Sequence, residues 1–201
     1  MVLNESPPRI RSVNRALAAP LRLPGGRSVL SGIGKRPVAG PVAVGKLGLQ
    51  GDEQADLNVH GGLHKAVYAY PAEHYAAWHA QRRAHGVSLF DEALPPGFLG
   101  ENLTIEGLLE TEVWVGDTLR FDGSACVLRV TAPREPCGKF IAVMGYAEAA
   151  RQMVREARCG WYLAVDEPGE LAPGMAMTLQ PGRRALSILD AIRAKWARHR
   201  H

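Results

Sequence analysis

The stretch ACVLRVTAPREPCGKF, residues 125–140, carries the strongest signals for both the fold and the chemistry. Its first half, ACVLRVTA, is an apolar run of strand length, which predicts a β-strand over 125–132. Pro133 and Pro136 then remove two backbone donors and stiffen the segment that leaves the strand. Cys137 follows at once, so we expect its thiol to be exposed just beyond a strand end.

Two cations, Arg134 and Lys139, flank Cys137 in the sequence. Nearby cations favour the thiolate form of a cysteine, which is the form that acts as a nucleophile or binds a soft metal. The alternative is an inert, buried cysteine. Cys126, inside the predicted strand, and Cys159, at the end of a predicted helix, fit that packing role instead.

Short strands separated by turns extend in both directions from this stretch, since the chain has 22 glycines and 14 prolines. The predicted strands are 27–30, 41–44, 66–71, 103–107, 113–121, 125–132, 161–165 and 175–180. Helices are predicted from Pro71 to a stop at Gly86, over 147–160 with Gly160 as cap, and after the capping box that begins at Ser187. We therefore expect a mainly β fold, a β-barrel of mixed topology with a few peripheral helices and a short C-terminal helix.

The 201 residues suit one domain, which we place at 9–182, followed by a basic amphipathic helix within 183–201. That tail carries a net charge of +5 and the whole chain +4, so residues 1–182 carry −1. Nucleic-acid binding is therefore not expected of the body, although a basic arm on a β-barrel stays open as a third interpretation. An odd number of cysteines with no close spacing, no leader and no 18-residue apolar run predict a cytoplasmic protein with thiols rather than disulfides and no membrane contact.

Three further stretches contain candidate binding residues. In NVHGGLHKAV (58–67), His60 precedes Gly61 and Gly62, where the backbone can approach a ligand closely or simply turn. His60 and His64 have the spacing of a zinc pair, but the two glycines argue against the helix that such a pair needs.

In GFLGENLTIEG (97–107), Glu101 and Asn102 stand at a strand entrance, where polar side chains can face a cleft. In GIGKRPV (32–38), Lys35 and Arg36 could hold a phosphate, although the segment is not a nucleotide P-loop. The sequence contains no G-x-S-x-G element and no G-x-G-x-x-G after a strand, so the usual hydrolase and dinucleotide signals are missing.

Taken in order, KRPV, GDEQADLNVHGG, KAVYAYP, FLGENL, VGDTLRF, PREPCGK and GWYLAV resemble the MOSC family, named for the C-terminal domain of molybdenum cofactor sulfurase. The resemblance is greatest to the bacterial stand-alone YiiM-like branch, which is linked to resistance to hydroxylated purine analogues. It covers roughly residues 9–182. Two departures stand out: His64 lies where many relatives carry an acid, and the C-terminal extension of some relatives is shortened to Pro181–His201.

The resemblance implies a β-barrel whose cleft binds a pterin-based molybdenum cofactor, with Cys137 as the molybdenum ligand. It implies catalytic roles for Cys137, Glu101 and Asn102, the last two through hydrogen bonds with pterin or substrate. The residues expected to hold the cofactor are Lys35, Arg36, His60, Gly61, Gly62, Lys65, Arg134 and Lys139.

By the same resemblance the activity is an oxidoreductase reaction, the reduction of N-hydroxylated small molecules such as hydroxylated purine analogues, in a detoxifying role. Binding of pyridoxal phosphate is not expected. The chain has no cysteine-rich iron–sulfur motif, so electrons are expected from a separate reductase. The alternative is a sulfur carrier in which Cys137 holds a persulfide.

Overall fold

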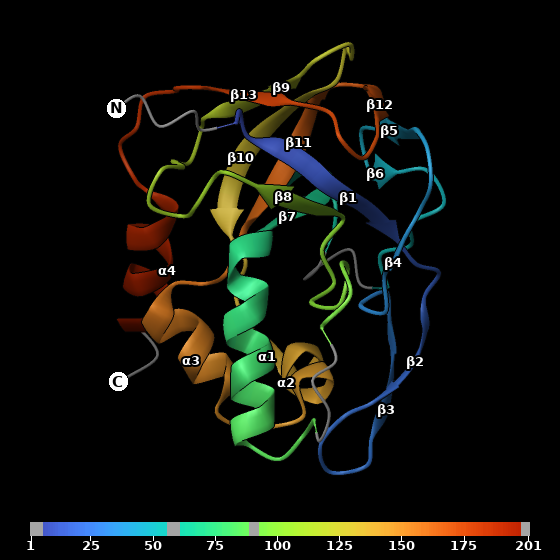
Figure 1. Ribbon diagram of the computed structural model, residues 1–201, viewed down its shortest axis with the longest axis vertical. Coiled ribbons are helices and arrows are strands. Elements are labelled where there is room, and N and C mark those ends of the chain that lie inside the picture. Colours follow the sequence, from blue (N-terminus) through green and yellow to red (C-terminus); the bar gives the residue numbers. More distant parts are fainter. Residues whose placement is uncertain (1–5, 56–60, 89–92, 198–201) are drawn as a thin grey trace.

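The structure, a computed structural model, describes residues 6–55, 61–88 and 93–197 (Figure 1). The chain is mainly β, as predicted, with a few helices. The strands are β1 (Arg9–Arg15), β2 (Ala19–Arg22), β3 (Ser28–Ser31), β4 (Arg36–Pro37), β5 (Val42–Gly45), β6 (Gly48–Leu49), β7 (Val67–Pro71), β8 (Leu103–Glu106), β9 (Thr118–Phe121), β10 (Val127–Pro133), β11 (Trp161–Glu167), β12 (Gly169–Leu171) and β13 (Met177–Gln180). The helices are α1 (Tyr75–Ala84), α2 (Gly138–Met144), α3 (Ala149–Glu156) and α4 (Ile188–Ala197), with short 3-10 turns η1 (Leu63–Lys65) and η2 (Ala72–His74).

The largest sheet has eight strands in the order β13-β9-β10-β11-β7-β8-β1-β4. Its pairings are antiparallel except for the parallel pair β7–β8. The strand predicted over 125–132 is confirmed as β10, whose side chains Leu128 and Val130 are fully buried or nearly so. β5, β6 and β12 form a smaller sheet, and β2 and β3 form a separate hairpin.

The expectation of a closed barrel is wrong, because the sheet is not closed into a barrel. β1 and the segment entering β13 meet at a single bridge, Arg9–Ala176. Two backbone hydrogen bonds flank it, from Ile10 N–H to the Met175 carbonyl (2.9 Å) and from Met177 N–H to the Pro8 carbonyl (2.7 Å). The ladder stops there, and the far end of β1 pairs with β4 instead.

The four helices gather at one end of the large sheet (Figure 1). α1 and α2 meet through Trp78 and Phe140, whose ring centroids are 5.7 Å apart in an edge-to-face contact. Both side chains are fully buried, so this pair anchors the helical layer. Among the described residues, no helix has both the length and the apolar character needed to span a bilayer.

The predicted C-terminal helix is confirmed as α4, and its capping box forms. The Ser187 hydroxyl donates to the Asp190 carboxylate (2.7 Å), and the Asp190 N–H donates back to Ser187 Oγ (3.0 Å). Ile188 and Ile192 are buried on the inner face of α4. The helix therefore packs on the body of the protein through the predicted apolar stripe.

The prediction that Gly160 caps α3 is wrong. The helix ends instead at Ala157, which adopts a left-handed conformation. Gly160 instead makes the turn that starts β11, with φ +60°. Its N–H donates to Glu110 Oε1 at 2.7 Å. A Cβ at this position would lie 2.3 Å from the Ala69 carbonyl oxygen, so only glycine fits here.

We expect Gly160→Ala to lower the free energy of unfolding by about 2 kcal/mol or more, because it adds a backbone clash to an unfavourable φ. Gly86→Ala is the matched control, since Gly86 has φ +68° but open space around it. The control should cost only about 1 kcal/mol. Urea unfolding of both variants measures the difference, and equal losses would show that the close approach to Ala69 does not matter.

Candidate functional site

A cleft with about 590 Å³ of empty space opens beside the ends of β10 and β11. Its walls come from segments far apart in the sequence, including 31–35, 52–55 and 99–102. Six of the residues predicted to bind or react line it together: Lys35, Lys65, Asn102, Arg134, Cys137 and Lys139. The fold thus brings the basic residues to the cysteine, which sequence spacing alone showed only for Arg134 and Lys139.

Cys137 is held at the junction between the segment that leaves β10 and α2. Its backbone is extended, and its carbonyl accepts a hydrogen bond from Ile141 N–H (3.1 Å) in the first turn of the helix. The side chain is half-buried, less exposed than expected. Cys126 and Cys159 are buried as predicted, and burial raises the pKa of Cys126 to about 12. Cys137 is therefore the one cysteine that faces the cleft.

Arg134 brings a buried positive charge to the cleft beside Cys137. The residue is 4% exposed, and its guanidinium lies 4.8 Å from the ring centroid of Phe140 and 5.7 Å from that of Tyr68. No carboxylate among the described residues forms an ion pair with it. Burying an unpaired charge is costly. The arrangement therefore favours an anionic ligand in the cleft.

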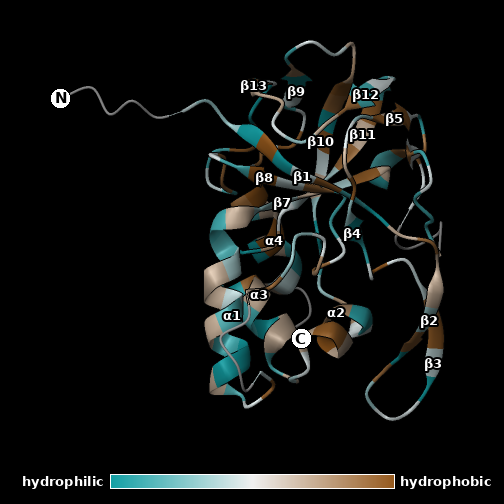
Figure 2. Ribbon diagram, turned by 45° about the vertical axis from the view of Figure 1, so that its right-hand side comes forward, coloured by the Kyte–Doolittle hydropathy of each residue, from teal (hydrophilic) through white to brown (hydrophobic). Residues whose placement is uncertain are grey.

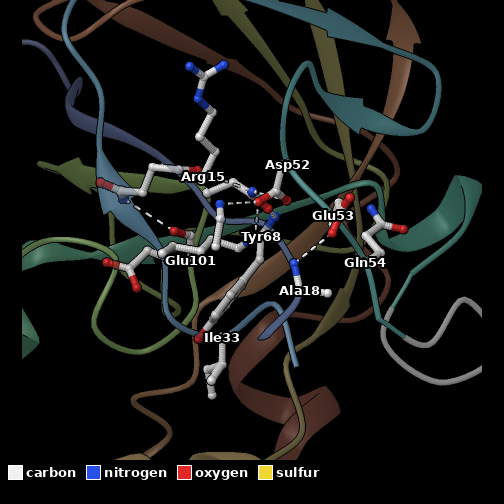
Figure 3. A network of polar contacts seen from close by, with 12 residues as sticks. Arg15, Ala18, Ile33, Asp52, Glu53, Gln54, Tyr68 and Glu101 are labelled. Atoms are coloured by element: carbon white, nitrogen blue, oxygen red, sulfur yellow. Dashed lines mark hydrogen bonds and ion pairs between the residues drawn. The ribbon is translucent and has the colours of Figure 1, made fainter. Parts of the chain in front are cut away.

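Lys35, by contrast, is neutralised within the protein by Asp52, which belongs to the polar network of Figure 3. Its ammonium forms a buried ion pair with the Asp52 carboxylate. Burial lowers the pKa of Lys35, and the charge of Asp52 opposes that shift. Asp52 also accepts hydrogen bonds from Asn102 Nδ2 (2.8 Å) and from Ala16 N–H (2.9 Å).

Asn102 is committed to the wall of the cleft rather than free to bind. Its Oδ1 accepts a hydrogen bond from Tyr68 N–H at 3.1 Å, while its Nδ2 donates to Asp52. The side chain thus ties the loop before β8 to β7. Its predicted hydrogen bond to pterin or substrate stays a prediction.

Glu101 lies behind the cleft, fully buried, and is not part of the lining. Its carboxylate accepts hydrogen bonds from Gly97 N–H (2.7 Å), Leu99 N–H (3.2 Å) and the Thr104 hydroxyl (2.8 Å), and from the Tyr75 hydroxyl. Burial raises its pKa above the usual value, against these hydrogen bonds. These contacts make Glu101 a residue that shapes the 97–102 loop, and its predicted catalytic role stays a prediction.

The other predicted residues are placed less centrally. Arg36 is exposed on β4, opposite Arg15 in the ladder, and does not line the cleft. Gly61 and Gly62 are half-buried before η1, and Gly62 N–H donates to Gln54 Oε1 at 3.0 Å. His60 lies outside the described residues.

The lining residues that sequence reasoning missed include Asp52, Glu53, Gln54, Tyr68 and Tyr162. The two tyrosines are direct cross-strand partners on β7 and β11, with ring centroids 5.5 Å apart. Their position in predicted strands was a usable signal, since alternate residues of a strand share a face. The three polar residues follow a turn at Gly51, and nothing local shows that this turn folds against Lys35.

The cleft holds no ready-made metal site. Among the described residues, no group of three or more histidine, cysteine, aspartate or glutamate side chains could hold a metal ion. A metal in this cleft would need ligands from a bound cofactor in addition to Cys137. That requirement fits a metal that arrives already coordinated by sulfur.

A family model described as the MOSC domain matches residues 56–178. The chain belongs to the MOSC family. Protein YiiM of Escherichia coli (strain K12) is 35% identical over 166 residues, 83% of this chain and 71% of that protein. The crystal structure of YiiM from Geobacillus stearothermophilus matches with a TM-score of 0.73 and 30% identity, covering 97% of this chain and 87% of that one.

A further relative bears on chemistry. A protein named "Reductase" from Gibberella moniliformis is 31% identical over 174 residues, which is 85% of this chain but 30% of that longer protein. MOSC membership confirms the family expected from the sequence.

We expect Asp52→Asn to lower the free energy of unfolding by about 3–5 kcal/mol at neutral pH, because it leaves the Lys35 charge buried without a partner. Lys35→Met alone should cost a similar amount. The double variant should lose much less than the sum of the two single losses. Thermal and urea unfolding of the four proteins give the cycle, and additive losses would contradict a buried ion pair.

The raised pKa of Glu101 predicts a pH dependence of stability. A carboxyl whose pKa is higher in the folded state binds its proton more tightly there, so its contribution falls as pH rises above its unfolded pKa, about 4.5. The stability of wild type relative to Glu101→Gln should therefore decrease from about pH 4.5 upward. Urea unfolding across this range tests it. A relative stability that rises with pH would mean that the four hydrogen bonds lower the pKa of Glu101 by more than burial raises it.

Proposed function

We propose that this protein binds a pterin-based molybdenum cofactor in the cleft and reduces N-hydroxylated small molecules there. The observation that carries the proposal is that Cys137 lines one cleft with the buried Arg134, which no carboxylate of the described residues pairs with. One offers a soft ligand for a metal, and the other offers a charge for an anion. A molybdenum cofactor has both a metal centre and an anionic phosphate.

The residues present fit this group. A thiolate suits molybdenum that already carries the dithiolene sulfurs of its pterin. Lys65, Arg134 and Lys139 supply positive charge within the lining, and Lys65 Nζ lies 5.4 Å from the ring centroid of Tyr162. When bound, the cofactor supplies the two-electron chemistry, and the protein supplies binding, orientation and electrostatics.

The protein's own part is to hold an anion and to keep the walls fixed. Burial raises the pKa of both Tyr68 and Tyr162, with Arg134 opposing the shift, so both remain neutral phenols at physiological pH. The Lys35–Asp52 pair adds no net charge to the wall. Attraction for an anion is therefore concentrated on Arg134, Lys65 and Lys139.

Reduction of an N–OH group to N–H consumes two electrons and two protons and releases water. Cys126 and Cys159 are buried and Cys137 lines the cleft, and among the described residues no three histidine, cysteine or acidic side chains gather as an iron–sulfur cluster would need. We therefore propose that a separate reductase delivers the electrons. Unaided turnover with a nicotinamide cofactor would contradict this part of the proposal.

The first test is elemental analysis for molybdenum in wild type and Cys137→Ala, each purified from a host that makes the cofactor. We expect near-stoichiometric molybdenum in the wild type and its loss in the variant. Cys137→Ser should also lose activity toward N-hydroxylated substrates while its stability stays close to wild type, because a half-buried side chain at the cleft contributes little packing.

Cys126→Ser is the matched control: it should retain molybdenum but lose stability, since a hydroxyl replaces a fully buried thiol. Absence of molybdenum from every variant in a well-supplied host would overturn the proposal. A persulfide on Cys137 in that protein, detected by mass spectrometry, would then establish the sulfur-carrier function instead.

A further inference from the structure

Exposed leucines gather beside the cleft. Among the described residues, the exposed large hydrophobic side chains are Leu17, Leu30, Leu47, Leu63 and Leu186. Leu30 and Leu47 line a second hollow together with the segment 52–55. The same segment lines the cleft, so the hollow and the cleft share a wall.

Two more of these leucines border the same region. Leu17 precedes Ala18, which lines the second hollow, and Leu63 lies in η1 with the cleft residue Lys65. Leu186 is apart from them, in the segment before α4, and pairs through its backbone carbonyl with Val115 N–H (3.0 Å). Leu30 and Leu47 thus line the second hollow itself, and Leu17 and Leu63 lie within two residues of a lining residue.

The segments that carry these leucines are strongly basic. Residues 9–51 contain eight lysines and arginines and no aspartate or glutamate, whereas residues 52–182 contain ten basic and 18 acidic residues. Within 15–51 the basic residues are Arg15, Arg22, Arg27, Lys35, Arg36 and Lys46. Lys35 is buried with Asp52, while the other five are exposed and form no ion pair with any acidic side chain of the described residues.

We call this surface the leucine–arginine face: Leu17, Leu30 and Leu47 with Arg15, Arg22, Arg27, Arg36 and Lys46. Much of it is carried by the β2–β3 hairpin, which projects from the body beside α2 (Figures 1 and 2). A two-stranded hairpin has little stability alone, so exposed leucines on it gain from being covered. An apolar centre with a charged rim is also the usual make-up of a protein–protein interface.

We propose that the leucine–arginine face docks an acidic electron-carrier protein. The proposal rests on the proposed function, which needs electrons from outside. The uncompensated arginines select a partner with an acidic rim and steer its approach, and the leucines supply the short-range contact. Because the face shares the 52–55 wall with the cleft, a carrier bound there stands next to the Cys137 site.

The test measures binding of two acidic one-electron carriers, a flavodoxin and a [2Fe–2S] ferredoxin, to the purified protein by calorimetry at low and high salt. We expect at least one carrier to bind and its affinity to fall with salt. The double variant Leu30→Glu/Leu47→Glu should weaken binding at least about tenfold, as should Arg22→Glu/Arg27→Glu. Leu186→Glu is the control, an exposed leucine outside the face, and should bind like wild type.

The readouts separate this inference from the proposed function. Docking is measured with or without molybdenum in the protein, and the face variants should keep wild-type molybdenum content and wild-type turnover with dithionite as chemical reductant. Failure of both carriers to bind, or equal binding by all variants, would overturn the docking surface. A homodimer that Leu30→Glu/Leu47→Glu breaks would also overturn it, because the face would then bind a second copy of this chain. Binding to anionic phosphatidylserine vesicles that the same variant loses would overturn it as well.

Discussion

The cleft depends on one buried carboxylate, that of Asp52. It pairs with Lys35, accepts a hydrogen bond from Asn102 and holds the backbone N–H of Ala16 (Figure 3). These contacts fasten the segment after β1, the segment before β4 and the loop before β8 to a single point. Hydrogen bonds to an ionised group are stronger than neutral ones, and burial strengthens them further. Glu53 adds two contacts to the segment after β1: its N–H donates to the Ala16 carbonyl (2.8 Å), and its carboxylate accepts a hydrogen bond from Ala18 N–H (2.7 Å).

Much of the strand framework could be predicted from the sequence, because apolar runs bounded by glycine or proline are local signals. The run 125–132 and the closing helix after Ser187 are examples, and both form where expected. α2 escaped prediction because GKFIAVM is only seven residues long and contains β-branched residues. The open sheet could not be predicted either, since closure depends on whether β1 and β13 pair along their lengths, a long-range property.

The sequence indicated several of the residues that gather at the cleft, but not which polar side chains are buried behind its wall. Cys137, Arg134 and Lys139 are neighbours in sequence, so their meeting at one cleft follows from the chain itself. The two acids Glu101 and Asp52 show the limit. Glu101 stands in the GENL motif but is buried behind the wall. Asp52 lies in the wall itself and forms an ion pair with Lys35. Which carboxylate meets a cation is decided by tertiary contacts that no local pattern encodes.

The two buried cations of the site, Lys35 and Arg134, differ in whether a carboxylate of the described residues pairs with them. Lys35 has its counterion inside the protein, so it shapes the wall whether or not a ligand is bound. Arg134 has aromatic rings and a methionine sulfur around it but no carboxylate among the described residues, so its charge is offset only in part. An anionic ligand removes that cost when it binds. The two buried cations therefore differ: Lys35 is paired within the protein, and Arg134 is the one at which an anionic ligand would gain most.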